Sequence, residues 1–349
     1  AWQETLALAV QLEDVDYQLQ AVWALFLECA NRGAAAEALG LADRFAALAQ
    51  QASDPQDQVI ARRLRGRALH FLGDLTGSRC ETEQMLELYE ARRSHLLRFQ
   101  YDQRLTAQII LARNLWLQGC ADRALALVEQ MITEAQAVEP TLTLGAVICD
   151  AACFIALWVG DMALAARYTE MLKAHAAPAA RAWHAQIDAF EGEILIRQGH
   201  AEAGVGLLKH AIRSLRAGPF CLNYTKFEGV LAEALLATGQ ISDARETVEG
   251  AIGRCHASGE AWYLAELMRI RAAALAAADR LTEAVEVLAE GFRIAHAQGA
   301  LAWELRLASA HAKIENSAGA RDTLRKVLSR VKEGFGTSDY LNAIATLGD

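Results

Sequence analysis

The stretch Thr225–His256, TKFEGVLAEALLATGQISDARETVEGAIGRCH, decides the fold because it is typical of two helices joined by a turn at Gly239. Apolar residues recur at helical spacing in each half, with Leu231 and Leu235 before the turn and Val248 after it. Neither half can bury its apolar stripe alone. The stretch therefore predicts an antiparallel helix pair that packs against similar pairs on either side.

The same turn recurs along the chain at intervals of about 40 residues. The turn positions are Gly33, Gly73, Gly119, Gly160, Gly199, Gly239, Asp279 and Glu315. Five residues after each turn the side chain is small: Ala38, Ser78, Ala124, Ala165, Gly204, Ala244, Ala284 and Ala320. Seven residues before it, all but Phe26 are small: Gly66, Ala112, Cys153, Gly192, Ala232, Ala272 and Ala308. We expect these two positions to lie where the paired helices come closest.

This frame predicts an all-α, tetratricopeptide-like helical-repeat solenoid, a right-handed superhelix of about eight helix-turn-helix units with a C-terminal capping helix. We expect one domain over 1–349, with repeats at 17–51, 57–93, 101–136, 142–176, 179–215, 225–256, 260–297 and 301–331 and a cap at 337–347. The four prolines, Pro55, Pro140, Pro178 and Pro219, fall between repeats, where they interrupt no helix. The segment Trp2–Leu12 resembles the second helix of a repeat whose first helix precedes it, so we expect the chain to be a fragment.

Composition restricts the function. The net charge of −9 opposes direct nucleic-acid binding, because phosphate neutralisation needs an excess of Lys and Arg. We expect no membrane span and no signal peptide, hence a cytoplasmic location, and the odd number of seven cysteines favours reduced thiols. No phosphate loop, G-x-S-x-G elbow or close histidine set occurs, so we expect no enzyme activity, no cofactor and no metal.

The small-residue frame resembles the tetratricopeptide repeat, although its period exceeds the usual 34 residues of that repeat. Twelve residues after the turn, the first four units carry large side chains in place of the expected alanine: Phe45, Met85, Met131 and Leu172. Longer stretches carry a closer resemblance, namely Phe99–Arg104 with Ala112–Gly119, Ala201–Arg216, Ala302–Arg306, and Glu333–Phe335 with Thr337 and Asp339. They resemble the C-terminal region of bacterial signal-transducing ATPases, in which a winged-helix DNA-binding domain and a P-loop ATPase module come first. Related cyclase-headed proteins carry a similar tail.

The inner wall of the predicted superhelix carries the candidate site. In tetratricopeptide-like units the residues thirteen, ten, six, three and two before the turn point inward. In repeats two to four these positions gather arginines and aromatic residues, which are common binding anchors. The candidate ligand- or partner-binding residues are Arg63, Arg67, His70, Arg113, Trp116, Asp150, Phe154 and Trp158. The alternative is that Trp116 and Trp158 only pack between helices and that the arginines pair with nearby acids.

The sequence thus favours a non-catalytic sensing and protein-interaction scaffold that binds a partner in its concave groove. The resemblance implies that this scaffold is the regulatory region of a signal-transducing ATPase or transcriptional regulator, with the ATPase and DNA-binding domains upstream in the same polypeptide. The expected partners are a protein or peptide and a small anionic effector. The alternatives are a free-standing peptide-binding receptor or adaptor, the regulatory tail of a cyclase-headed relative, and an enzyme whose active site is spread over the groove.

Overall fold

The protein is built from antiparallel helices, as seen in a computed structural model that describes residues 1–92, 97–98, 101–137, 142–176, 181–218 and 223–348. In chain order the helices are α1 (Trp2–Gln11), α2 (Val15–Asn31), α3 (Ala35–Ala49), α4 (Gln56–Leu72), α5 (Leu75–Arg92), α6 (Gln103–Leu117), α7 (Ala121–Ala137), α8 (Leu142–Val147), η1 (Ile148–Ala152), α9 (Cys153–Val159), α10 (Met162–His175), α11 (Arg181–Arg197), α12 (Ala201–Arg216), α13 (Tyr224–Ala237), α14 (Ile241–Ser258), α15 (Leu264–Ala277), α16 (Leu281–Gln298), α17 (Leu301–Glu315), α18 (Ala318–Leu328) and α19 (Ser338–Gly348). Two short strands, β1 (Leu97–Arg98) and β2 (Tyr101–Asp102), pair antiparallel before α6, with Leu97 opposite Asp102. The predicted all-α class is confirmed. Pro55 lies at the start of α4, whereas Pro140, Pro178 and Pro219 fall outside the described residues.

The small residues of the repeat frame lie where paired helices touch. A Cβ atom on Gly192 of α11 would meet the backbone oxygen of Gly204 on α12 at 2.9 Å, and one on Gly204 would meet the oxygen of Gly192 at 2.5 Å. In the preceding half of the chain, the Ser78 hydroxyl donates to the Gly66 carbonyl oxygen at 2.6 Å. Larger side chains at these positions would force the helices of a pair apart.

The turns between paired helices adopt the left-handed backbone conformation that favours glycine. Gly33, Gly73, Gly119, Gly160, Gly199 and Gly239 all have φ between 76° and 90°, and Asp279 has φ 59°. In the last pair the left-handed residue is Asn316, with φ 51°, rather than the expected Glu315, which ends α17. Asn tolerates this region because its short side chain hydrogen-bonds locally, so the frame slips by one residue there.

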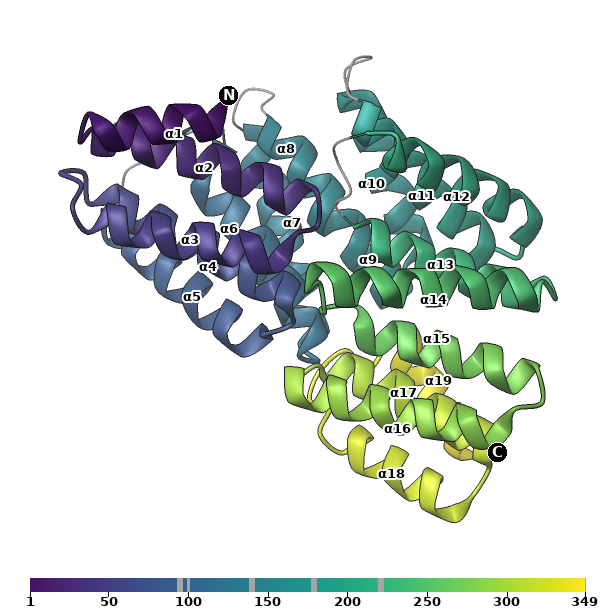
Figure 1. Ribbon diagram of the computed structural model, residues 1–349. Helices are drawn as coiled ribbons and strands as arrows, with labels where there is room; N and C mark the ends of the chain where they lie inside the picture. Colours follow the sequence, from purple (N-terminus) through teal and green to yellow (C-terminus); the bar gives the residue numbers. More distant parts are fainter. Residues whose placement is uncertain (93–96, 99–100, 138–141, 177–180, 219–222, 349) are drawn as a thin grey trace.

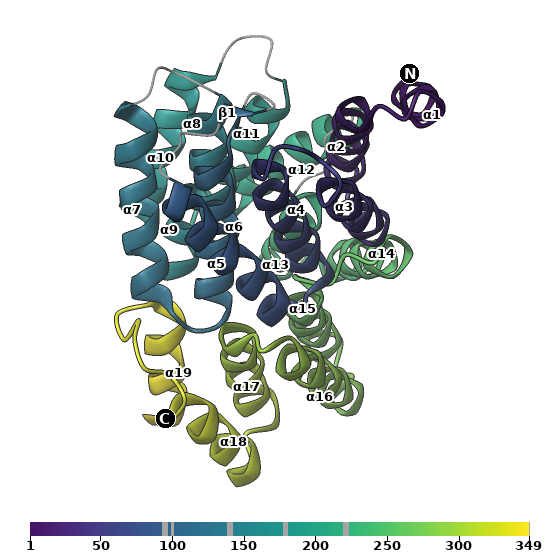
Figure 2. The same cartoon turned by 90° about the vertical axis from the view of Figure 1, so that its left-hand side faces the viewer.

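The superhelix is wound tightly enough to bring distant pairs together (Figures 1 and 2). The end of α14 reaches the start of α3, where a Cβ atom on Gly259 would lie 3.2 Å from the Cβ atom of Ala36. At the C-terminus, α19 packs on α17 and α18 and touches α9. The segment before α19 reaches α7, where the Gly334 amide donates to the Asp122 carboxylate at 3.0 Å. The chain thus closes on itself around a largely buried interior.

One segment is apolar enough to raise the question of a membrane. Leu142–Val159, which comprises α8, η1 and α9, has a mean hydropathy of 2.1 over 18 residues, which by length and composition alone is enough to cross a membrane. The segment is 72% buried inside the protein. Its apolar side chains therefore form the centre of the superhelix, and it is the one such segment among the described residues.

Candidate functional site

The inner wall of the superhelix is covered by the loop between α14 and α15. The amides of Ala261 and Trp262 both donate to the carbonyl oxygen of Phe71, the penultimate residue of α4, at 2.8 and 3.3 Å. The Gln298 side chain donates to the Ala261 carbonyl oxygen at 2.7 Å, and the Trp303 indole donates to the Trp262 carbonyl oxygen at 3.0 Å. These four bonds join α4 to the α14–α15 loop and to the helices that follow it. The loop therefore closes the interior over the predicted site.

Arg113 of α6 lies at the centre of this interior and is only 1% exposed. Its Nη1 donates to Asn223 Oδ1 at 3.0 Å, and Asn223 Nδ2 donates to Asp150 Oδ1 at 2.9 Å. Burial lowers the pKa of Arg113 to about 10, and the nearby Asp150 carboxylate opposes that shift. Desolvation raises the pKa of Asp150, against the opposing charges of Arg67 and Arg113. Asn223 thus bridges the buried Arg113 guanidinium and the Asp150 carboxylate.

The backbone around this bridge is unusual at two places. Asp150 lies in η1, a π-helical turn inside an otherwise α-helical segment, and such turns are frequent at functional sites. Asn223 has φ 64°, in the left-handed region that few residues other than glycine and asparagine adopt readily. Both side chains of the bridge to Arg113 therefore come from irregular backbone.

Aromatic rings enclose the Arg113 guanidinium. Its Cζ atom lies 4.3 Å from the ring centroid of Trp262, 4.8 Å from Phe154 and 5.5 Å from Phe71. Each contact stabilises the charged guanidinium, because the face of an aromatic ring carries a negative electrostatic potential. Arg67 faces the same Phe71 ring at 5.7 Å, so the two guanidinium groups share one aromatic side chain.

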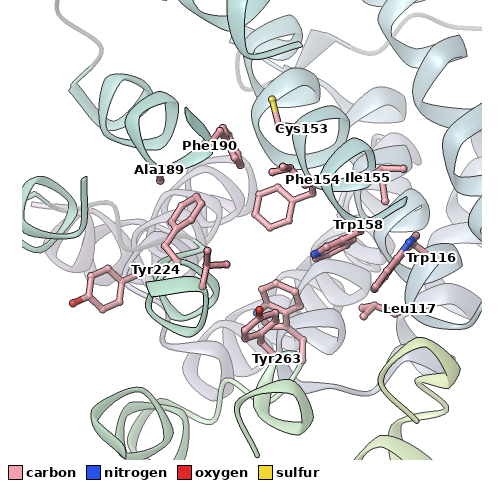
Figure 3. Packing of buried hydrophobic residues seen from close by; sticks show 14 of the residues in the cluster. Trp116, Leu117, Cys153, Phe154, Ile155, Trp158, Ala189, Phe190, Tyr224 and Tyr263 are labelled. Atoms are coloured by element: carbon pink, nitrogen blue, oxygen red, sulfur yellow. The ribbon is translucent and has the colours of Figure 1, made fainter. Parts of the chain in front are cut away.

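Trp116 and Trp158 belong to an aromatic stack that adjoins the rings around Arg113. Their rings stack with centroids 4.5 Å apart, and Trp158 meets Phe154 edge to face at 5.2 Å (Figure 3). Both indoles are nearly fully buried, and Trp303 packs on each of them. The packing role considered for the two tryptophans is thus present in the structure.

A small cavity of about 30 Å³ lies beside Trp116, between the α6–α7 turn and the C-terminal cap. It is lined by Gly119, Leu301, Thr337 and Asp339 among others. The space suits one or two water molecules and does not include Arg113.

His70 is held in one orientation by a chain of hydrogen bonds. Its Nδ1 lies 2.7 Å from Asn114 Oδ1, and Asn114 Nδ2 donates to the Ser78 hydroxyl at 2.8 Å, which in turn donates to the Gly66 carbonyl oxygen. Since the Asn114 oxygen accepts, His70 carries its proton on Nδ1. Burial, with Arg113 and Arg67 nearby, holds the pKa of His70 well below its usual value, so the ring is neutral at pH 7.

The structure therefore brings Arg67, Arg113, His70, Asp150 and Phe154 into one cluster. Arg63 of α4 is 4% exposed and lies one turn before Arg67. Trp116 and Trp158 lie beside the cluster as its apolar wall.

Sequence reasoning missed three residues that complete the cluster: Asn223, Glu260 and Trp262. Glu260 accepts hydrogen bonds from the Thr225 hydroxyl at 2.8 Å and from the Trp262 indole at 2.7 Å, and burial raises its pKa. All three lie in connections between helices, where the repeat frame assigns no inward position. The Gly-Glu-Ala-Trp sequence between two helices is the signal that could have pointed to Trp262, because tryptophan is highly buried on average.

Comparison with known proteins supports the fold. No protein-family model matches the sequence, and no curated protein does. The structure is similar to that of a Rap protein complexed with competence and sporulation factor, with a TM-score of 0.63 and 13% identity over 96% of each chain. It is also similar to the APC/C hetero-tetramer Cut9–Hcn1, with a TM-score of 0.55 and 10% identity over 96% of this chain and 54% of that one. The chain is a helical-repeat solenoid of the tetratricopeptide-like class.

Proposed function

We propose that the chain is a non-catalytic sensing and protein-interaction scaffold that binds a peptide, protein or small anionic effector on its inner wall. The observation that carries the proposal is the cluster of Arg67, His70, Arg113 and Asp150 at the centre of the superhelix, in which His70 and Arg113 are buried and Arg67 and Asp150 are partly buried. Removing these groups from water is unfavourable, and apolar side chains would fill the same space more stably. A cluster of this kind is better explained by binding than by packing.

We further place this scaffold in a bacterial signal-transducing ATPase or transcriptional regulator of the cytoplasm. The support is the resemblance of Ala112–Gly119, Ala201–Arg216 and Glu333–Phe335 to the C-terminal region of such proteins. In that setting, binding on the inner wall would favour one of two states of the whole regulator, and the upstream ATPase and DNA-binding domains would report the state.

The first test is a thermal-shift screen of the chain against short peptides, nucleotides and small anionic metabolites, followed by calorimetry on each hit. We expect Arg67→Gln and Asp150→Asn to abolish binding of the true ligand. Arg62→Gln is the matched control, because Arg62 lies on the same helix but pairs with Glu81 on the outer side at 2.8 Å. A ligand whose affinity is the same for all three variants and the parent binds elsewhere, and the inner-wall assignment is then wrong.

The regulatory setting has its own test. The full-length gene product is assayed for ATP turnover with and without the ligand found in the screen. A ligand-dependent change that Arg67→Gln removes supports coupling to an ATPase. A gene product without an upstream ATPase or DNA-binding domain removes this part of the proposal.

A free-standing peptide-binding receptor is the second candidate. It is favoured by the similarity, over almost the whole length of both chains, to a Rap protein whose complex contains competence and sporulation factor. A third alternative is that the chain is the regulatory tail of a cyclase-headed relative. The full-length gene sequence distinguishes it from the other two, because it would encode a cyclase domain upstream. In each case the inner wall is the binding surface, so the variants above test it equally.

A further inference from the structure

The Arg113 guanidinium has an unused edge. Its Nη1 donates to Asn223, but neither Nε nor Nη2 has a hydrogen-bond partner among the described residues, although the side chain is 1% exposed. Nε and Nη2 lie along one edge of the planar guanidinium and form a fork that can bind both oxygens of a carboxylate or phosphate. Buried donors without partners are rare, and each lost hydrogen bond is unfavourable.

Other buried cations of the inner wall have direct carboxylate partners. Lys226 pairs with Glu193, and both side chains are 1% exposed. Arg306 pairs with Glu266 at 2.9 Å and with Asp339 at 2.8 Å. Arg113, by contrast, donates directly only to the Asn223 amide oxygen. In the described part of the chain, the Nε–Nη2 fork of Arg113 thus has no carboxylate partner.

The two carboxylates near Arg113 are already engaged. Asp150 accepts from Asn223, and Glu260 accepts from Thr225 and from the Trp262 indole. Arg67 adds a second positive charge beside the fork, and its Nε also finds no hydrogen-bond partner in the described part of the chain. Arg67 and Arg113 thus face the carboxylates Asp150 and Glu260, while the fork itself is enclosed by aromatic rings and keeps unpaired donors.

We propose that the Nε–Nη2 edge of Arg113, with Arg67 beside it, is a binding subsite for one oxyanion of carboxylate or phosphate type. The inference deepens the proposed function and rests on it, since it names the chemical group by which the ligand would be held on the inner wall. The anion would accept the hydrogen bonds that Nε and Nη2 of Arg113 now lack. Trp262 covers the guanidinium face, so its indole lies against the subsite.

The test uses the whole chain at pH 7 and constant ionic strength, with sodium acetate and sodium phosphate titrated against sodium chloride. The readouts are tryptophan fluorescence, to which Trp262 is one of seven contributors, and the thermal midpoint. We expect at least one oxyanion to give a saturable fluorescence change that chloride does not give. Phosphate also stabilises proteins without binding a site, so saturation is the criterion rather than the thermal midpoint alone.

Three variants locate the site. Arg113→Lys keeps a positive charge but removes the fork, and should weaken the apparent affinity about tenfold or more, as expected for one charge-assisted hydrogen bond. If Arg113→Lys does not fold, Arg67→Gln takes its place, because Arg67 is only partly buried and should weaken binding in the same direction. Arg62→Gln, on the outer side of the same helix, should bind like the parent.

The outcomes separate this inference from the proposed function. No saturable effect of either oxyanion on the parent chain overturns the inference, as does saturable binding that Arg113→Lys and Arg67→Gln both leave unchanged. A peptide or protein that binds through Asp150 without any oxyanion effect leaves the proposed function standing and the inference wrong. Oxyanion binding at Arg113 with no larger partner or effector supports the subsite and counts against the proposed function.

Discussion

The contact between the end of α4 and the α14–α15 loop can be tested with two glycines that occupy the same position in their repeats. Gly73 and Gly239 both have positive φ, 83° and 77°, and so both favour glycine over alanine. A Cβ atom on Gly73 would lie 2.5 Å from the Gln298 amide nitrogen and 3.4 Å from the Ala261 carbonyl carbon. One on Gly239 would meet no atom of the described residues within 4 Å. Comparing alanine variants of these two glycines therefore separates the cost of backbone strain from the cost of disturbing the contact between α4 and the α14–α15 loop.

The expected magnitudes follow from these contacts. Gly239→Ala should lower the free energy of unfolding by about 1–2 kcal/mol, the penalty for a Cβ atom in the left-handed region. Gly73→Ala carries the same penalty and also displaces the Gln298 side chain, which now donates to the Ala261 carbonyl oxygen. Losing that bond and crowding the contact adds roughly 1–3 kcal/mol. The total for Gly73→Ala is thus about 2–5 kcal/mol, the sum of these two effects.

The assay is urea denaturation of the two variants and the parent, followed by circular dichroism and by tryptophan fluorescence. Gly199→Ala serves as a second control, because its Cβ atom would also meet nothing within 4 Å in the described structure. Equal destabilisation of all three variants would refute the reasoning that repeat two and the α14–α15 loop are joined through Gln298. A larger effect at Gly73 alone supports the closure.

Three further predictions concern the inner wall. The folded protein holds His70 neutral, whereas the unfolded chain protonates it near its ordinary pKa of 6.5. The free energy of unfolding should therefore fall by roughly 1.4 kcal/mol for each pH unit below about 6.5. Denaturant titrations at pH 7, 6 and 5 measure this slope, and His70→Gln should remove it. Asn223→Ala removes the hydrogen bonds to Arg113 and Asp150 and should lower the free energy of unfolding in urea by about 3–5 kcal/mol. Asn342 is exposed, so Asn342→Ala serves as the control and should change it by less than about 0.5 kcal/mol. Lys226→Met leaves the buried Glu193 carboxylate with only the Arg197 guanidinium at 3.8 Å and should cost about 3–5 kcal/mol. Lys226→Met with Glu193→Leu should recover most of that loss. Equal instability of the single and double variants contradicts the account.

The sequence predicted the helical frame because the frame depends on local constraints. Each turn needs a residue that tolerates positive φ, and each helix pair needs small side chains at its crossing, as Gly192 and Gly204 show. Both requirements repeat at fixed offsets, so they can be recognised without any structure. The one slip, Asn316 in place of Glu315, occurs where the turn has no glycine. The periodicity of Leu142–Val159 gave no sign of the π-helical turn, because nearly every residue there is apolar.

The composition of the site was only half predictable, for a different physical reason. Inward offsets place Arg67, Arg113 and Asp150 on one wall, because those residues belong to successive repeats and face the same way. Which loop lies opposite them depends on the pitch of the superhelix, and small rotations between neighbouring pairs add up over the repeats between α4 and α15. No local pattern encodes that sum, so the pairing of Phe71 with Ala261 and Trp262 could not be foreseen. For the same reason the contact between α4 and the α14–α15 loop matters for the site. A change of pitch at any repeat between α4 and α15 would move Trp262 relative to Arg113.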